Sequence, residues 1–344
     1  MSEPRWRLAW PGGQGAAVAT ADFKTRPEDF LVDEILAVAD QTAPVEQGAA
    51  LPGQGEHLYL RLEKTGDNSD YVSRELAALS GCQPHEVGLC GLKDRHAVTR
   101  QWFSVQRPGR EVGDADFIAA VAERWPVLAA GRFLRKLRRG EHQGNRFELL
   151  LRQVSGDRQA IETGLERLRA QGCPNYYGPQ RFGWQGSNLD QACRLRPGRR
   201  RGRDRRQGLY FSAARSWLFN EVLAERVLAG NWHQRLEGEP VNGEVTGPLW
   251  GDGGTLATGA QGELERQVVA AHPALASVFS QTRMKPERRA LVLRPRGLEW
   301  YWPGPDSLRL EFELAPGQFA TSLLADVFQL RDASKQVADL AESE

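Results

Sequence analysis

Apolar residues recur along the chain with two different periods. Leucines occupy every second position from Leu58 to Leu62, and apolar side chains alternate in the same way from Leu308 to Leu314. Because successive side chains of a strand point to opposite faces, both stretches predict half-buried strands.

Helical spacing appears between these strands. Val72, Leu76 and Leu79 lie four and three residues apart and follow Asn68, which can cap a helix. The same spacing at 161–168 predicts a second helix. Strands with intervening helices indicate an α+β protein built around an antiparallel or mixed sheet.

The middle of the chain has a different composition. Segment 212–229 is rich in apolar side chains, ends before Gly230 and predicts a further helix. Glycines and prolines are frequent at 238–262, which predicts loops or a small irregular lobe.

Composition and charge exclude some classes of protein. Of the 344 residues, 40% are hydrophobic and 26% charged, which excludes a wholly disordered chain. The formal net charge is only +1, but charge is unevenly distributed. Segment 132–146 contains six basic residues and one acidic residue, Glu141, and segment 194–206 contains eight arginines and one acidic residue, Asp204. Two such clusters favour a polyanionic partner, RNA or DNA, over the alternative of a solvated surface.

The sequence also predicts a compartment. Its first fifteen residues carry charges and prolines where a signal peptide needs an apolar run, and no stretch approaches the roughly 20 apolar residues of a membrane span. The four cysteines lack CxxC spacing and the six histidines are scattered. We therefore expect a cytoplasmic protein with reduced, mostly buried thiols and no metal site.

The densest group of reactive side chains lies at 88–102. Asp94 stands between Lys93 and Arg95, whose charges favour the ionised carboxylate and lower its pKa. An ionised aspartate beside cations suits nucleophilic or base chemistry on a nucleotide. The alternative is a salt-bridge cluster on the surface.

Two other segments could contact a nucleotide. At 175–184 (NYYGPQRFGW), aromatic rings are interleaved with an arginine and a glutamine, and could stack on bases or fill a core. Asn145, in the sequence GNRF, could recognise a uracil edge or form a turn.

Five motifs in this order resemble the TruD family of tRNA pseudouridine synthases, which act on uridine 13. They are PEDFLVDEIL, GLKDRHAVTRQWF, GNRF, NYYGPQRFG and GQFATSLL, and they extend from about residue 20 to about residue 330. Residues 230–285 look shortened relative to the family.

The resemblance implies a fold and a domain organisation. The fold is an α+β pseudouridine-synthase catalytic domain with a mixed or antiparallel sheet and flanking helices, interrupted by an inserted, family-specific α/β domain. By the motifs, the catalytic domain occupies 1–171 and 296–344, and the insertion occupies 172–295.

The resemblance also implies an active site. Asp94 takes the position of the family's nucleophilic aspartate, and Lys24 matches a basic position upstream of PEDF. The positions expected to contact the substrate are Phe30, Asn145, Phe319, Phe147 and Glu34.

The activity implied is isomerisation of uridine to pseudouridine in tRNA, with no metal or organic cofactor. The expected partner is tRNA, without a membrane or a metal, and we expect a monomer. Two alternatives remain at this point. One is a non-catalytic RNA-binding protein or RNA chaperone, and the other is a metal-independent nuclease with His96 as base and Asp94 as its orienting partner.

Overall fold

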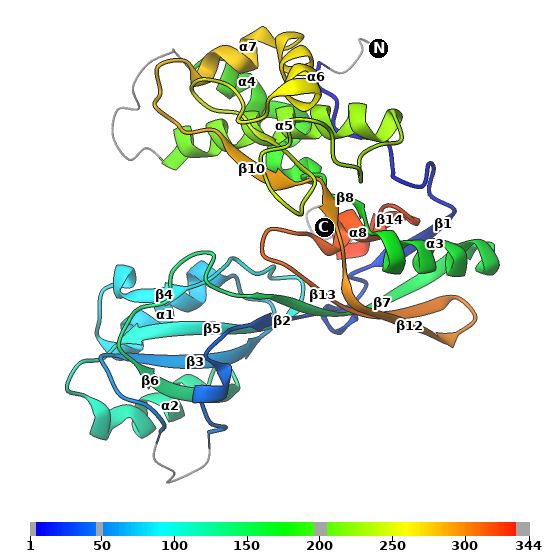
Figure 1. Cartoon of the computed structure of the whole chain (residues 1–344). Coiled ribbons are helices and arrows are strands. Elements are labelled where there is room, and N and C mark those ends of the chain that lie inside the picture. Colours follow the sequence, from blue (N-terminus) through cyan, green and yellow to red (C-terminus); the bar gives the residue numbers. More distant parts are fainter. Residues whose placement is uncertain (1–4, 46–50, 196–204, 335–344) are drawn as a thin grey trace, which may run out of the picture. The chain divides into compact units, whose positions relative to one another are not determined.

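A computed structural model describes residues 5–45, 51–195 and 205–334 (Figure 1). The chain divides into two compact units, each built from separated segments. We call them the sheet unit (Ala19–Gly156, Pro295–Gly317 and the residues from Leu330 on) and the helical unit (the residues up to Val18, Asp157–Arg294 and Gln318–Gln329).

The sequence-predicted domain limits differ in part from these units. The chain leaves the sheet unit after Gly156, whereas the resemblance set the first limit at 171/172. It returns after Arg294, against a predicted limit at 295/296. The division into a catalytic and an inserted domain stays a prediction.

The described part of the sheet unit is organised around one mixed sheet with the strand order β12-β13-β7-β2-β5-β3-β6. Neighbouring strands are antiparallel except for β2 and β5, which are parallel. Three further strands join it, since β1 pairs with β7 and β14, and β4 pairs with β5. The strands are β1 (Ala19–Phe23), β2 (Phe30–Ile35), β3 (His57–Lys64), β4 (Val87–Leu89), β5 (Val98–Gln106), β6 (Val127–Phe133), β7 (Gly144–Gly156), β12 (Arg296–Gly304), β13 (Ser307–Leu314) and β14 (Phe328–Asp332).

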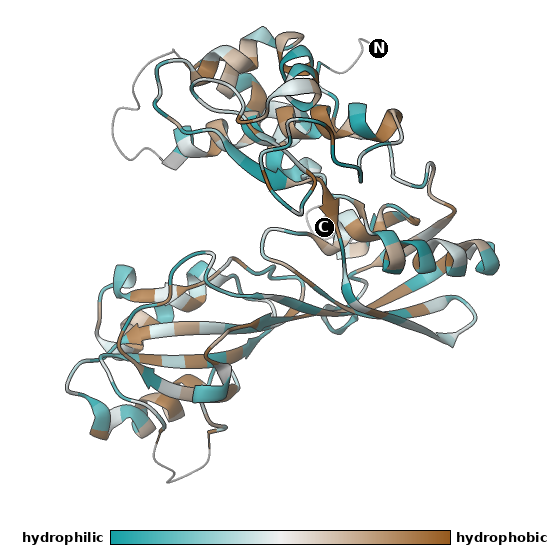
Figure 2. Ribbon diagram, viewed as in Figure 1, coloured by the Kyte–Doolittle hydropathy of each residue, from teal (hydrophilic) through white to brown (hydrophobic). Residues whose placement is uncertain are grey.

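Two α-helices cover part of one sheet face. Leu58, Leu60 and Leu62 of β3 are fully buried and pack with Leu76 and Phe117 from these helices. In Figure 2, the strands alternate between hydrophilic and hydrophobic residues, as a sheet with two different faces requires. The helices are α1 (Ser69–Ser80) and α2 (Asp114–Ala122), and the short 3-10 helices are η1 (Pro27–Asp29), η2 (Ala39–Gln41), η3 (Pro84–Glu86) and η4 (Glu111–Gly113).

The helical unit is packed around the long helix α5, which is mostly buried from Phe211 to Arg226. Its residues Trp217, Phe219 and Leu223 pack with Phe182 and Phe279 from other segments. The unit comprises α3 (Arg158–Gln171), α4 (Ser187–Cys193), α5 (Arg205–Leu228), α6 (Gly259–Ala270), α7 (Pro273–Ala276), α8 (Ala320–Leu324), the pair β8 (Cys173–Pro174) and β11 (Val292–Leu293), the pair β9 (Thr246–Leu249) and β10 (Glu287–Ala290), and the 3-10 helices η5 (Pro179–Phe182), η6 (Trp184–Gly186) and η7 (Ser277–Phe279).

The predicted elements can be compared directly with the structure. The two strands are confirmed as β3 and β13, the three helices are confirmed as α1, α3 and α5, and the α+β class with a mixed sheet is confirmed. Asn68 caps α1, because its Oδ1 accepts a hydrogen bond of 2.8 Å from the amide of Tyr71. The prediction of irregular structure at 238–262 is wrong in part, since β9 and the first turn of α6 lie there.

All four cysteines are free, and Cys90 and Cys173 are buried. In the described part of the chain, no helix combines the length and the apolar character needed to cross a membrane.

The expectation that the basic cluster at 132–146 serves a polyanionic partner is wrong for Arg132. Its side chain is 5% exposed, its Nε donates to Asp114 Oδ2 at 2.6 Å, and Asp114 also accepts from Arg107 at 2.9 Å. Arg132 also donates to Glu111 at 3.2 Å, so the carboxylates of Asp114 and Glu111 together compensate the two buried guanidinium groups. Arg135 and Arg146 of the same cluster pair with Glu141 and Glu313, and the second cluster lies mostly at 196–204, outside the described residues.

Replacement of Arg132 should destabilise the sheet unit. Arg132→Ala leaves Asp114 with one cation fewer and removes several buried hydrogen bonds, so the free energy of unfolding should fall by about 3–5 kcal/mol in urea titrations. Arg138→Ala is the control, because Arg138 is exposed, and it should change stability by less than about 0.5 kcal/mol. Equal effects of the two changes would contradict a structural role for Arg132.

Candidate functional site

Asp94 lies on the loop between β4 and β5 and keeps part of its surface exposed. Its side chain is 39% exposed, and Oδ1 accepts a hydrogen bond of 3.0 Å from the backbone amide of His96. Oδ2 accepts from the ammonium group of Lys24, which is only 10% exposed. The carboxylate is thus fixed from two sides and still accessible.

The backbone of Lys24 has an unusual conformation, and its side chain lies over aromatic rings. Lys24 follows β1 with φ of 56°, in the left-handed region that residues other than glycine seldom adopt. Its ammonium nitrogen lies 4.7 Å from the centroid of the Phe30 ring and 5.5 Å from that of Phe23. The two aromatic rings therefore hold the cation through cation–π contacts while it donates to Asp94.

The electrostatic balance keeps Asp94 ionised. Partial burial acts to raise the pKa of its carboxyl group, but the hydrogen bonds from Lys24 and the His96 amide lower it, and the net pKa lies below the ordinary value. The predicted direction is confirmed, but Lys93 and Arg95 are not the cause. Lys93 pairs with Glu34, and Arg95 donates to the ring of His96.

A chain of buried hydrogen bonds anchors the loop before Asp94. The hydroxyl of Ser69, at the start of α1, accepts from the Lys93 amide at 3.0 Å and donates to Gln101 Oε1 at 2.7 Å. The Gln101 amide nitrogen in turn donates to the carbonyl of Gly91 at 2.7 Å. Ser69 and Gln101 are both fully buried, so these bonds are shielded from water.

Glu34 anchors the same loop from the neighbouring strand β2. Its side chain is fully buried, Oε2 accepts from the ammonium group of Lys93, and Oε1 accepts from the Trp102 amide at 3.3 Å. Both carboxylate oxygens therefore have protein partners. A direct contact of Glu34 with substrate stays a prediction.

A third lysine lies behind the site. Lys64 is almost fully buried at the end of β3, and its ammonium group donates to the carbonyl of Asp67 at 2.8 Å. Burial lowers its pKa to about 8, and the charge of Lys93 lowers it as well, whereas Asp67 and Asp94 act to raise it. Lys64 is thus electrostatically coupled to the Asp94 loop.

The register of the sheet places four predicted residues on one face. Glu34 lies opposite Asn145 in the β2–β7 pair, and Val32 lies opposite Phe147. Phe30, two residues before Val32, shares this face, and its ring meets the ring of Phe147 edge-on at 6.2 Å. The structure therefore brings Phe30, Glu34, Asn145 and Phe147 to one face of the sheet, and Phe30 and Glu34 are linked to the Asp94 loop through Lys24 and Lys93.

These residues differ in what they offer to a ligand. Phe30 and Phe147 are each 7% exposed, and Phe147 stacks on Phe312 at 5.3 Å, so both rings belong mainly to the core. Asn145 is 8% exposed, and its buried Oδ1 accepts no hydrogen bond from any described residue. An acceptor that is buried without a partner costs free energy, and Asn145 Oδ1 can regain this energy by accepting a hydrogen bond from a ligand.

Phe319 belongs to the helical unit, where it is half-buried and precedes α8. Its contact with substrate stays a prediction. In the aromatic segment 175–184, Tyr177 and Phe182 fill the core of the helical unit, whereas Trp184 is 83% exposed.

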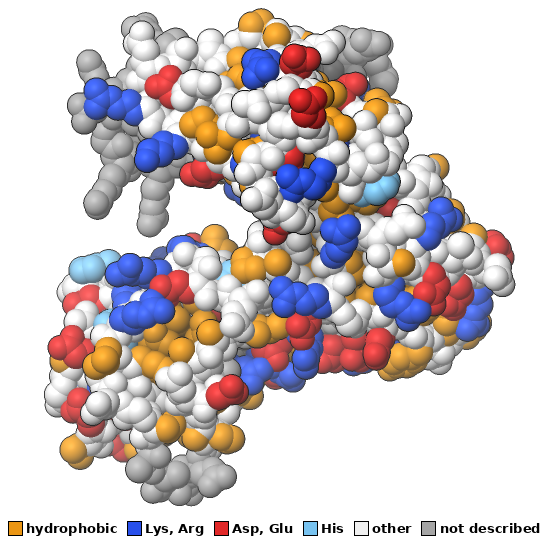
Figure 3. Space-filling view, viewed as in Figure 1, with side chains coloured by type: hydrophobic (Ala, Val, Ile, Leu, Met, Phe, Trp, Pro, Cys, Tyr) orange, Lys and Arg blue, Asp and Glu red, His pale blue; other side chains and the backbone are white. Residues whose placement is uncertain are grey.

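The opposite face of the sheet carries charge pairs. Arg146 donates to Glu313 at 2.8 Å, and Arg309 donates to Glu148 at 2.6 Å. In Figure 3, acidic and basic side chains lie next to one another over β7 and β13. Their charges are largely compensated, so this face is not a strongly positive surface.

The geometry argues against the nuclease alternative. Asp94 accepts from the backbone amide of His96 and not from its ring, so it does not orient the imidazole. The ring Nε2 of His96 accepts from Arg95 at 2.9 Å, which occupies the lone pair that a general base needs.

Within 5–45, 51–195 and 205–334, no three His, Cys, Asp or Glu side chains are grouped as metal ligands.

The sequence interpretation missed Ser69, Gln101 and Lys64. For Lys64 a signal was present, because it continues the inward positions Leu58, Leu60 and Leu62 of the predicted strand. A charged residue in that series indicates a buried charge with a special role.

Comparisons with known proteins agree with the resemblance found in the sequence. The family model described as tRNA pseudouridine synthase D (TruD) matches residues 16–190. A protein of Marinobacter nauticus named tRNA pseudouridine synthase D is 56% identical, with 97% of this chain and 98% of that protein covered. One of the same name from Cellvibrio japonicus is 39% identical, with 98% of each covered.

A solved structure supports the fold. The crystal structure of a putative tRNA pseudouridine synthase D from Methanosarcina mazei superposes with a TM-score of 0.63 at 18% identity, covering 95% of this chain and 97% of that one. At this identity the likeness establishes the fold alone.

The hydrogen-bond chain under the loop can be tested with Ser69→Ala. The change leaves the Lys93 amide without its acceptor and Gln101 without its donor, so the free energy of unfolding should fall by about 1–3 kcal/mol. Exchange of the Lys93 amide hydrogen should accelerate about tenfold or more. Ser73→Ala is the control, since the Ser73 hydroxyl donates only to the carbonyl of Ser69 within α1. Unchanged Lys93 exchange in Ser69→Ala would show that the loop does not depend on this anchor.

Proposed function

Since the chain belongs to the TruD family of tRNA pseudouridine synthases, we propose that it converts uridine 13 of tRNA to pseudouridine, with Asp94 as the reacting group. The observation that supports this most directly is a half-exposed carboxylate held ionised by Lys24 on an anchored loop. The proposal includes action as a monomer in the cytoplasm.

The proposed reaction is an isomerisation in which one ionised carboxylate can act as the reacting group. The N1–C1′ bond of the uridine breaks, the uracil rotates, and C5 bonds to C1′ while the proton on C5 is lost and N1 gains one. No net oxidation or reduction occurs. Ionised Asp94 can attack the sugar, attack the base or abstract the 2′ proton, and in each route the negative charge is the reactive feature.

The other site residues have distinct roles in the proposal. Lys24 keeps the carboxylate charged and aimed, and Glu34 and Lys93 hold the loop that carries it. The target uridine leaves its stack at a cost of roughly a few kcal/mol, which contact with aromatic side chains offsets. Phe30 is the ring we assign to this contact, because the ammonium group of Lys24 that binds Asp94 also lies over the Phe30 ring.

Asn145 is assigned to recognition of the uracil. Its free Oδ1 is an acceptor that complements the N3–H donor of the base, and its amide group can donate to a uracil carbonyl. Cytosine has no N3–H, so this pair would favour uracil over cytosine.

Asp94→Asn should abolish turnover and preserve the fold. The amide removes the negative charge, while its oxygen can still accept from Lys24, so thermal stability should change little. Single-turnover release of tritium from 5-tritiated uridine in tRNA should become undetectable, and the dissociation constant for tRNA should stay equal or decrease. Because the pKa of Asp94 lies below the ordinary value, its charge persists as pH falls to about 5, and any acid limb above that pH has another origin.

The matched control is Asp70→Asn, on the exposed first turn of α1. It should retain the wild-type rate. Substantial tritium release by Asp94→Asn would refute the assignment of Asp94, and joint loss of binding and turnover would indicate a structural salt bridge instead.

Asn145→Ala should impair the reaction without impairing stability. Because Oδ1 accepts no bond from the described protein, its removal loses none, and the melting temperature should hold. We expect kcat/KM to fall roughly 10- to 100-fold, the value of roughly one or two hydrogen bonds to the base. Asn188→Ala, in the helical unit, serves as control and should leave kcat/KM unchanged. A wild-type kcat/KM for Asn145→Ala would remove Asn145 from substrate recognition.

A further inference from the structure

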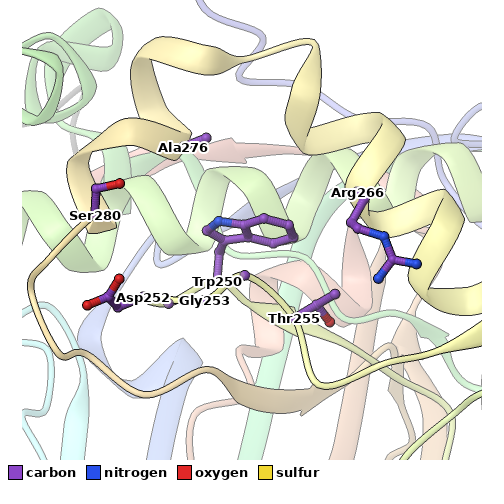
Figure 4. Close-up of a pocket in the computed structure, with 9 residues that line it drawn as sticks. Trp250, Asp252, Gly253, Thr255, Arg266, Ala276 and Ser280 are labelled. Atoms are coloured by element: carbon purple, nitrogen blue, oxygen red, sulfur yellow. The ribbon is translucent and has the colours of Figure 1, made fainter.

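The helical unit contains a pocket that the proposed chemistry does not use (Figure 4). Its volume is about 300 Å³, at the lower end of the range for small-molecule sites. Its lining comes from the turn after β9, from α6, from α7 and from Ser280, all within the helical unit.

Trp250 forms the centre of the pocket. It follows β9, is half-buried and packs in part against the core of the helical unit. Its carbonyl accepts a hydrogen bond of 2.6 Å from Arg215, which fixes the backbone at this point. Figure 4 shows the indole in the middle, with Arg266 on one side and Asp252 and Ser280 on the other.

The turn beside the indole is preformed. Gly251 and Gly254 exchange backbone hydrogen bonds of 3.2 and 3.0 Å, and Gly254 has φ of 92°. A Cβ atom at Gly254 would lie 3.2 Å from the Trp250 ring, so glycine lets the backbone approach the indole closely. Asp252 fixes the turn, because its carboxylate accepts from the amides of Gln281 at 3.1 Å and Arg283 at 2.8 Å.

Three donors in the pocket are unused. Among the described residues, no hydrogen bond or ion pair is made by the guanidinium of exposed Arg266, the indole N–H of Trp250 or the hydroxyl of Ser280. The acidic group nearby is occupied, since each oxygen of Asp252 already accepts from a backbone amide. The pocket therefore combines an aromatic surface with free donors and one free positive charge.

We propose that this pocket binds one unpaired nucleotide of the RNA substrate, with the base against Trp250 and the phosphate on Arg266. Aromatic rings stack on bases irrespective of sequence, and guanidinium groups bind phosphate oxygens in pairs. A carboxylate ligand would satisfy Arg266 but would leave the indole surface unused. The inference rests on the proposed function, because it takes the ligand to be part of tRNA.

The test measures the affinity of the whole protein for an unmodified tRNA transcript by filter binding. Trp250→Ala should weaken binding about tenfold or more, and Trp250→Phe should stay within about threefold of wild type because a ring remains. Arg266→Gln should weaken binding about fivefold and reduce the slope of log affinity against log salt by about one. Arg158→Gln is the control. It removes one exposed charge from α3 of the same unit, where Arg158 pairs with Glu162, and it should change neither the affinity for tRNA nor the salt slope.

Pseudouridine formation separates this inference from the proposed function. With protein in saturating excess, Trp250→Ala should form pseudouridine at the wild-type single-turnover rate. If the wild-type protein forms none, the proposed function fails. If the wild type is active but Trp250→Ala or Arg266→Gln binds tRNA as the wild type does, the pocket inference is overturned.

The melting temperature of each variant shows whether a loss of binding comes from loss of the fold. Should Trp250→Ala unfold, Trp250→Phe and Arg266→Gln still decide the matter. Equal loss of binding in Trp250→Phe and Trp250→Ala, with a lowered melting temperature in both, would make Trp250 a core residue and overturn the inference.

Discussion

The ion pair between Lys24 and Asp94 imposes the main constraint on the sheet unit. The Asp94 carboxylate remains charged and accessible on a loop that has no regular secondary structure of its own. The residues that hold this carboxylate are largely buried, whereas the carboxylate itself is partly exposed. Lys24 is held over Phe30, while Ser69, Gln101 and Glu34 bind the loop from below.

The two faces of the sheet carry different kinds of side chain, and the strand residues that support the Asp94 loop belong to the buried face. One face carries fully buried leucines under α1 and α2 and, beyond β5, the polar groups Glu34 and Asn145 beside aromatic rings. The other face carries charge pairs such as Arg146–Glu313. Buried polar groups are tolerated on the first face because most of them have partners, and Asn145 Oδ1, which we propose contacts the base, is an exception.

Charge clusters in the sequence were an incomplete guide to an RNA-binding surface. The cluster at 132–146 looked largely uncompensated because, apart from Glu141, its acidic partners lie elsewhere in the chain, for example at Asp114 and Glu313. In the helical unit, the aromatic segment 175–184 mainly fills a core, whereas Trp250, in a region predicted to be irregular, lines a pocket. Local composition thus identified the residue types but not the surfaces to which they contribute.

The sequence by itself determined the periodic elements and the family, and it singled out Asp94 as the candidate reactive residue, because period, capping and long motifs are local properties of the chain. Only the tertiary structure decided which cation faces Asp94. Lys93 and Arg95 are adjacent to Asp94 in sequence but contact Glu34 and His96 instead. Lys24, which follows β1 and lies 70 residues before Asp94 in the sequence, is the cation that binds it. Side-chain partners depend on strand register and loop direction, and these follow from long-range packing that no local pattern records.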